Sequence, residues 1–172
     1  FGQRAHRPRG VVSVSAHWYI RGTAVTAMPH PKTIHDFAGF PPALYDVQYP
    51  APGDPALAAR VKELLAPTEV IEDTSRWGLD HGTWSVLKHV YPQADVPVVQ
   101  LAIDGTKPLD YHYQLARRLA PLRDEGVLVA GSMKTTALML IFGVLGTLVG
   151  LYLAFGRDNW RFGDHMPTGI GR

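Results

Sequence analysis

Histidine is the residue type through which this chain could hold a metal ion or move protons. The sequence contains eight histidines and no cysteine, so any metal must be held by His, Asp or Glu. The absence of cysteine also excludes disulfides, thiolate ligands and a cysteine nucleophile. His17, His35 and His81 lie beside expected elements or in a long aromatic loop. Imidazole titrates near neutral pH and ligates metals, so each is a candidate for metal binding or acid–base catalysis.

Two of these histidines lie at the ends of expected elements. His17 ends the β-prone run Gly10-Val-Val-Ser-Val-Ser-Ala-His, where a strand is expected to meet a loop. Open α/β sheets bind ligands at this carboxyl end of their strands, although a surface histidine at a strand end has the same pattern. His81 lies in Asp80-His81-Gly82, ahead of an expected helix. It could contact a substrate there, or pack beside a helix that Asp80 caps.

A long loop rich in proline, glycine and aromatic residues separates these two histidines. It covers residues 28–53, and a loop of this length in a compact domain is usually functional or disordered. Within it, His35 could line a pocket or stabilise the loop. Phe37, together with Trp18 next to His17, could form the apolar walls that a flat aromatic substrate needs. Core packing explains both aromatic residues equally well.

The elements that must position these residues alternate between strand and helix. Strands are expected near 11–16, 68–72, 96–103 and 127–131, and helices from Pro55 to the residue before Pro67, over 82–91 and over 108–124. This alternation predicts an α/β fold with three layers, α/β/α, around a largely parallel or mixed central sheet. The carboxyl edge of that sheet would carry the site.

The amino-acid composition is that of a folded domain and excludes some classes of function. Hydrophobic residues make up 46% of the chain and charged residues 19%, which is typical of a folded domain. The formal net charge is +2 and the basic residues are scattered, so no nucleic-acid partner is predicted. The lack of cysteine fits a cytoplasmic protein. The chain begins with Phe1 and no signal peptide is recognisable, so we expect it to start inside a longer protein.

The sequence after Met133 differs in composition from the sequence before it. Residues 137–155 carry no charge over about the length that spans a bilayer, between Lys134 and Arg157. We therefore expect residues 133–172 to form a transmembrane-like helix over 137–155 with a short polar tail, which would make the protein membrane-associated. A buried core helix is the alternative. Basic residues are balanced on the two sides, so no membrane orientation is predicted.

Several short motifs occur in one order along residues 1–132. They are Ser15-Ala-His-Trp18, Thr33-Ile-His-Asp-Phe37, Gly39-Phe-Pro41, Tyr49-Pro-Ala-Pro-Gly53 and Leu79-Asp-His-Gly82. Together with the strand–helix pattern, this set resembles the class III extradiol ring-cleavage dioxygenases of the 4,5-DOPA dioxygenase type, in the LigB-like superfamily. The resemblance implies an oxidoreductase that opens a catechol such as DOPA with O2 and a non-haem metal.

The resemblance also assigns roles to residues. It implies that His17 is a metal ligand and that His81 acts at the catechol pocket, with His35, Phe37 and Trp18 around the substrate. The implied cofactor is Fe(II), because the redox chemistry requires iron, while Zn would suit the same ligands. The family's other ligand motifs are not matched in this chain, and Met133-Lys-Thr-Thr stands where an acid–base histidine motif is expected.

We therefore expect residues 1–132 to be a partial dioxygenase domain, joined at 132/133 to an unrelated membrane segment, and inactive in this form. The alternatives are a membrane-tethered, non-catalytic binding domain on the same scaffold, or a translated relic. Neither the physiological catechol nor the oligomeric state is predicted by the sequence.

Overall fold

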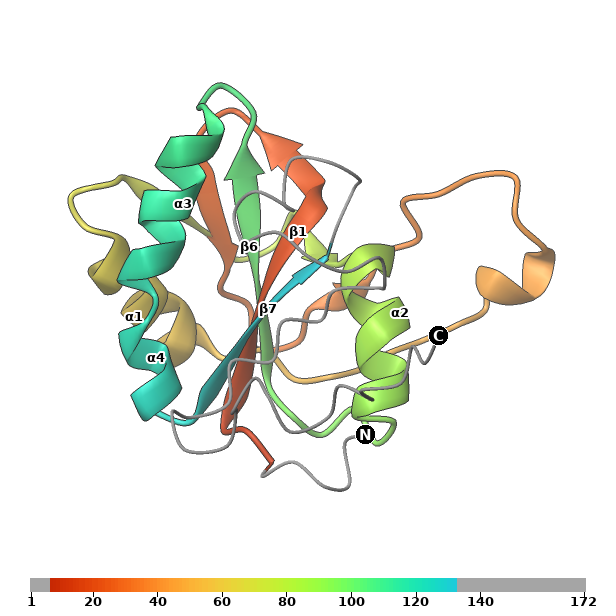
Figure 1. The fold of residues 1–172 in the computed structure, drawn as a ribbon. Helices are drawn as coiled ribbons and strands as arrows, with labels where there is room; N and C mark the ends of the chain where they lie inside the picture. Colours follow the sequence, from red (N-terminus) through yellow and green to blue (C-terminus); the bar gives the residue numbers. More distant parts are fainter. Residues whose placement is uncertain (1–6, 133–172) are drawn as a thin grey trace, which may run out of the picture.

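The computed structural model describes residues 7–132, which form a layered α/β unit around a five-stranded sheet (Figure 1). The strand order is β4-β2-β6-β1-β7. These strands are β1 (Gly10–Ile20), β2 (Thr23–Thr26), β4 (Val70–Asp73), β6 (Val98–Asp104) and β7 (Val127–Ser132). The helices are α1 (Pro55–Leu65), α2 (His81–Val90), α3 (Leu109–Arg118) and α4 (Pro121–Asp124). The predicted α/β fold with a central sheet is confirmed.

The sheet is mixed. Strand β1 pairs in parallel with both β6 and β7, whereas β2 runs antiparallel to β6 and carries β4 in parallel beside it. The sequence analysis missed β2. The chain reverses after β1 through Gly22, whose φ of +94° lies in the left-handed region that glycine adopts readily. The four residues that follow are too few to show a clear period of two.

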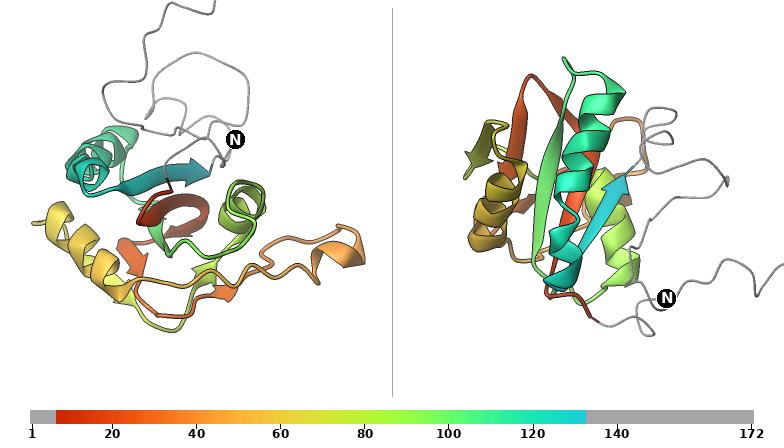
Figure 2. Two further views of the ribbon diagram at one scale, coloured as in Figure 1. Left: turned by 90° about the horizontal axis from the view of Figure 1, so that it is seen from below. Right: turned by 60° about the vertical axis from the view of Figure 1, so that its left-hand side comes forward.

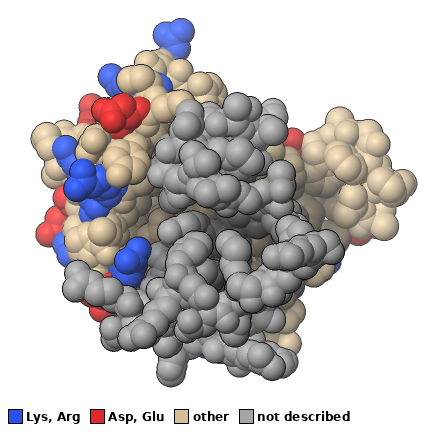
Figure 3. Space-filling model, viewed as in Figure 1, with Lys and Arg blue, Asp and Glu red and all other residues tan. Residues whose placement is uncertain are grey.

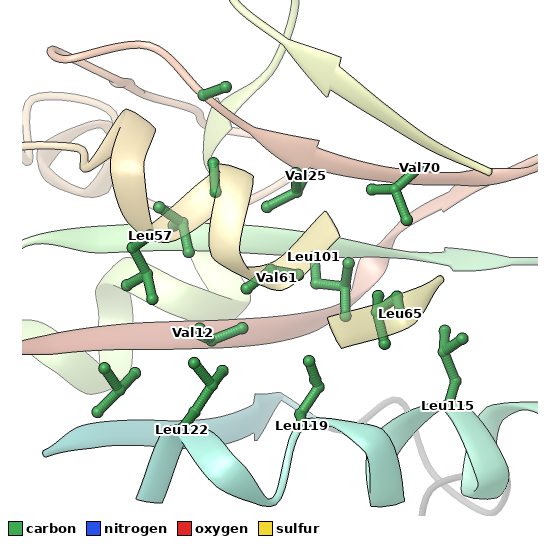
Figure 4. Close-up of a cluster of buried hydrophobic side chains, with 14 residues drawn as sticks. Val12, Val25, Leu57, Val61, Leu65, Val70, Leu101, Leu115, Leu119 and Leu122 are labelled. Carbon is green, nitrogen blue, oxygen red and sulfur yellow. The ribbon is translucent and has the colours of Figure 1, made fainter. Parts of the chain in front are cut away.

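Helices cover both faces of the sheet, as Figure 2 shows. Successive strand residues point to opposite faces, so Val12 packs with α1, α3 and α4 while Val11 packs with α2. On the first face, Leu57, Val61 and Leu65 of α1 are fully buried against the sheet (Figure 4). Burying each such side chain contributes roughly 1.5–3 kcal/mol, which holds α1 across the strands.

Local signals account for most helix ends. Asp54 caps α1 by accepting a hydrogen bond from the backbone N–H of Leu57, and Pro55 occupies the first turn. The single helix predicted over 108–124 is wrong in its continuity. It divides into α3 and α4 at residues 119–120, just before Pro121, because proline has no N–H to continue the helical hydrogen bonds.

The long loop between β2 and α1 extends from the body of the domain past α2 (Figure 1). It contains β3 (Lys32–Thr33) and a 3-10 turn at Pro42–Leu44. Strand β3 pairs in parallel with β5 (Gly78–Leu79) in a second, two-stranded sheet. At its far end, the loop is held by Tyr49, which is fully buried and donates a hydrogen bond to the carbonyl oxygen of Tyr91.

The expected membrane helix over 137–155 and the boundary at 132/133 lie outside the described residues. Within residues 7–132, no helix is long and apolar enough to cross a bilayer.

Candidate active site

His17 lies in the last part of β1, which continues to Ile20, so the strand does not end at His17 as predicted. The register of β1 against β6 shifts between Ser15 and Tyr19, so His17 belongs to an irregular part of the strand. Irregularities of this kind change the direction in which a side chain points. The backbone N–H of His17 donates a hydrogen bond of 3.1 Å to the hydroxyl of Ser15, which fixes the backbone at this point.

The small β3–β5 sheet brings a distant segment to His17. An added Cβ on Gly78 would collide with the carbonyl oxygen of Lys32, so a larger residue could not allow this close pairing. The pairing continues with a hydrogen bond from the N–H of Ile34 to the carbonyl oxygen of Leu79. Two residues further on in each segment, Asp36 meets His81.

Asp36 stands between the two imidazoles. Its Oδ1 accepts a hydrogen bond from the backbone N–H of His81 at 2.9 Å and lies 2.8 Å from His81 Nδ1. Its Oδ2 lies 3.6 Å from His17 Nδ1, which is a charge contact rather than a hydrogen bond. The ring centroids of His17 and His81 are 4.1 Å apart. Two histidines that the sequence singled out therefore lie together, while their roles stay predictions.

The electrostatics of Asp36 follow from its contacts. Burial opposes ionisation of the carboxyl group, but the hydrogen bonds from the backbone and ring of His81 outweigh it, so the pKa of Asp36 is lowered. The carboxylate is only 17% exposed, and the side chains of His17 and His81 are 18% and 30% exposed. A charged carboxylate therefore lies beside two partly buried imidazoles.

Sequence analysis did not single out Asp36. It considered the triplet His35-Asp36-Phe37 for its histidine and its phenylalanine only. The available signal was that Asp36 belongs to one of the quoted motifs, but no local pattern shows that residues 36 and 81 meet.

The ring of His35 is bonded within the long loop. Its Nε2 lies 2.9 Å from the carbonyl oxygen of Val47, on the other side of the loop. Its ring also packs against Phe37, Tyr45 and Trp84. These contacts correspond to the loop-stabilising alternative considered for this residue.

A mostly apolar pocket lies directly beside His81. It has a volume of about 200 Å³ and is lined by Phe37, Phe40 and Trp84 as well as His81. Phe37 meets the ring of His81 edge-on, at 5.3 Å between centroids. A protein cavity of about 150 Å³ already accommodates benzene, so the pocket is large enough for one aromatic ring.

Trp18 does not line this pocket. It is buried and stacks on Trp77, with 5.5 Å between centroids and 4° between planes, in a small core cluster with Ala24 and Ala102. The core-packing alternative describes its position. Its neighbour His17 instead contacts Asp36.

A buried hydrogen-bond network centred on Asp80 supports the site. The carboxyl group of Asp80 is fully buried and accepts hydrogen bonds from Ser15 Oγ and Gln100 Nε2, both at 2.5 Å, and from the N–H of Thr83. Asp80 thus caps α2, as expected, and also joins α2 to β1 and β6. Because Ser15 contacts the backbone of His17 and Asp80 precedes His81, this network holds both histidines.

Figure 3 shows how charged side chains are distributed over the described part of one face. Lysine and arginine mix with acidic residues over α3 and α4 on the left, and the protruding loop on the right is largely uncharged.

The arrangement can perform two kinds of chemistry. Donor atoms of His17, Asp36 and His81 all lie within 4.8 Å of one another, so together they could approach one metal ion. Imidazole and carboxylate suit divalent transition metals, including Fe(II) and Zn(II). An imidazole beside a carboxylate can also take a proton from a substrate hydroxyl.

Comparisons with known proteins agree with this chemistry. A sequence model of the catalytic LigB subunit of aromatic ring-opening dioxygenase matches residues 3–135. A 4,5-DOPA dioxygenase extradiol of Escherichia coli (strain K12) is 58% identical over 131 residues, covering 76% of this chain and 48% of the relative. One of Beta vulgaris is 42% identical over 132 residues, covering 76% of this chain and 49% of the relative.

A solved structure is similar as well. The crystal structure of an uncharacterized protein from Escherichia coli K12 matches with a TM-score of 0.63 and 50% identity, covering 76% of this chain and 48% of that one. The chain thus spans about half the length of the relatives it matches.

Proposed function

The chain belongs to the family of the catalytic LigB subunit of aromatic ring-opening dioxygenases, and we propose that it acts as part of an extradiol dioxygenase that opens a catechol ring with O2. The observation that carries this proposal is the convergence of His17, Asp36 and His81 beside an aromatic-walled pocket. Relatives whose names state a 4,5-DOPA dioxygenase activity support a DOPA-like catechol as the substrate.

The residues fit the metal that this chemistry requires. Two imidazoles and a carboxylate offer N and O donors within reach of one ion, which suits Fe(II) or Zn(II). We assign His17 as the ligand from this part of the chain. His81 lines the aromatic pocket, which favours a role in contacting substrate. When bound, Fe(II) would supply the redox chemistry and the open positions at which catechol and O2 meet.

The remaining steps belong to the protein. Phe37, Phe40 and Trp84 bind the flat ring of the catechol and exclude water from it. His81 then accepts a proton from a catechol hydroxyl, with its imidazolium stabilised by Asp36. His35 holds the loop through Val47 and so keeps Phe37 against the pocket.

A chimera with the longer Escherichia coli relative tests the proposal. Residues 3–132 of this protein replace the matched segment in the Escherichia coli relative, which is 58% identical over 131 residues. After anaerobic loading with Fe(II), the chimera is mixed with DOPA and O2, and the yellow ring-opened product and oxygen uptake are measured. We expect turnover. A folded chimera that binds a catechol without oxygen uptake would instead support the non-catalytic binding domain.

A further inference from the structure

We propose that Asp36 is a positioning residue that orients both imidazoles, so that each carries its proton on Nδ1 and presents Nε2 to the metal or the substrate. What the two Nε2 atoms bind depends on the proposed function. The geometry that carries it is independent of that function.

The two carboxylate oxygens of Asp36 are divided between the two histidines. Oδ1 is directed at His81, through both its backbone N–H and Nδ1, at 2.9 and 2.8 Å. Oδ2 faces Nδ1 of His17 at 3.6 Å. A carboxylate only accepts hydrogen bonds, so Nδ1 of His81, at hydrogen-bond distance, must be the protonated nitrogen of that ring. At 3.6 Å, Oδ2 favours an N–H over a lone pair on His17 Nδ1 by electrostatic attraction alone. In a neutral imidazole the other nitrogen, Nε2, then carries the lone pair.

This arrangement matters because a metal ligand and a proton acceptor both need a lone pair at a defined atom. Metal-bound histidines commonly donate their second ring N–H to a carboxylate, which fixes the ring orientation and raises ligand basicity. Here one carboxylate is placed to do this for His17 and, at the same time, to orient His81.

The position of Asp36 is itself firmly set. Pairing of β3 with β5 fixes the segment before it, and the indole N–H of Trp84 donates a 2.8 Å hydrogen bond to the carbonyl oxygen of Ile34. The carboxylate therefore reaches the histidines from a supported loop. Asp46 in the same loop is exposed and provides a matched control for loss of one negative charge.

The first test measures tautomers in the metal-free 172-residue chain. Nitrogen chemical shifts of ¹⁵N-labelled histidines distinguish a protonated ring nitrogen from one with a lone pair. We expect protonated Nδ1 in His81 of the wild type, and a shift of the proton towards Nε2 in Asp36→Ala. In Asp36→Asn one oxygen remains for His81, while the amide NH₂ faces His17, so His17 alone should change. Asp46→Asn should change neither.

The second test measures Fe(II) affinity of the same variants by anaerobic calorimetry. Loss of a carboxylate behind a ligating histidine costs about 10–100-fold in affinity, which we expect for Asp36→Ala but not for Asp46→Asn. A dispersed amide spectrum confirms folding, and Asp36→Asn replaces the alanine variant if that one is unfolded. An unchanged His81 tautomer in Asp36→Ala would overturn the proposal. If Asp36→Ala changes the tautomers but the chimera has no dioxygenase activity, the positioning role of Asp36 stands and the proposed function is refuted.

Discussion

The buried carboxyl group of Asp80 should contribute more to stability than an ordinary helix cap does. It accepts hydrogen bonds from Ser15, Gln100 and Thr83 in a fully buried position. The Asp80→Ala variant removes the cap of α2 and leaves two buried donors without this acceptor. Asp54→Ala is the matched control, because Asp54 caps α1 with one hydrogen bond to Leu57 and joins no such network.

The magnitudes separate the two variants. Loss of a helix cap costs about 0.5–2 kcal/mol, which is the full expected effect of Asp54→Ala. Loss of the acceptor of the buried Gln100 amide adds about 1–3 kcal/mol. Part of this is offset because alanine carries no polar group into the interior. We therefore expect Asp80→Ala to lose roughly 2–5 kcal/mol, about 1–3 kcal/mol more than the control.

Equilibrium unfolding in urea measures the difference in the 172-residue chain. The midpoint should fall much further for Asp80→Ala than for Asp54→Ala, with an unchanged slope if the native state keeps its compactness. If Asp80→Ala is too unstable to purify, Asp80→Asn provides the comparison, since its amide NH₂ would face the donors of Ser15 and Gln100. Equal midpoints for the two alanine variants would refute the network argument.

Three further predictions concern the site and its loop. In the Fe(II)-loaded chimera, His17→Ala should abolish both metal binding and ring opening, whereas His30→Ala, which changes an exposed histidine, should leave both intact. Metal content and product formation are measured, and retained activity in His17→Ala would reject the role of His17 as a ligand. Phe37→Ala should raise the KM for the catechol about 2–10-fold with a smaller change in kcat, because an aromatic contact contributes about 0.5–1.5 kcal/mol. Tyr113→Ala, on an exposed part of α3, is its control, and an unchanged KM would exclude Phe37 from the pocket. Burial raises the pKa of Tyr49 to about 12, so the folded state favours its neutral form. This contribution of Tyr49 to the free energy of unfolding, roughly 2–3 kcal/mol, is fully present below about pH 10 and is lost as the pH rises through about 12. Urea unfolding across this range should show a larger loss in the wild type than in Tyr49→Phe, in which Tyr91, whose pKa burial also raises, still contributes.

The sequence predicted most of the longer elements and singled out two of the three groups at the site. Alternating apolar runs, the caps at Asp54 and Asp80, and prolines at helix ends act within a few residues, so local patterns report them reliably. The same patterns located His17 at a strand end and His81 at a helix start, and the ordered motifs connected both residues to one family.

Only the tertiary structure decided which side chains meet. Asp36 reaches His81 across 45 residues of chain because two two-residue strands, β3 and β5, pair with each other. Strands that short have no readable period, and neither does β2, whose antiparallel pairing makes the sheet mixed. The same limit applies to Trp18, since an aromatic residue beside His17 serves a pocket or a core equally well in sequence. Local periodicity records that a side chain is buried, whereas its partner depends on contacts between segments far apart in the chain.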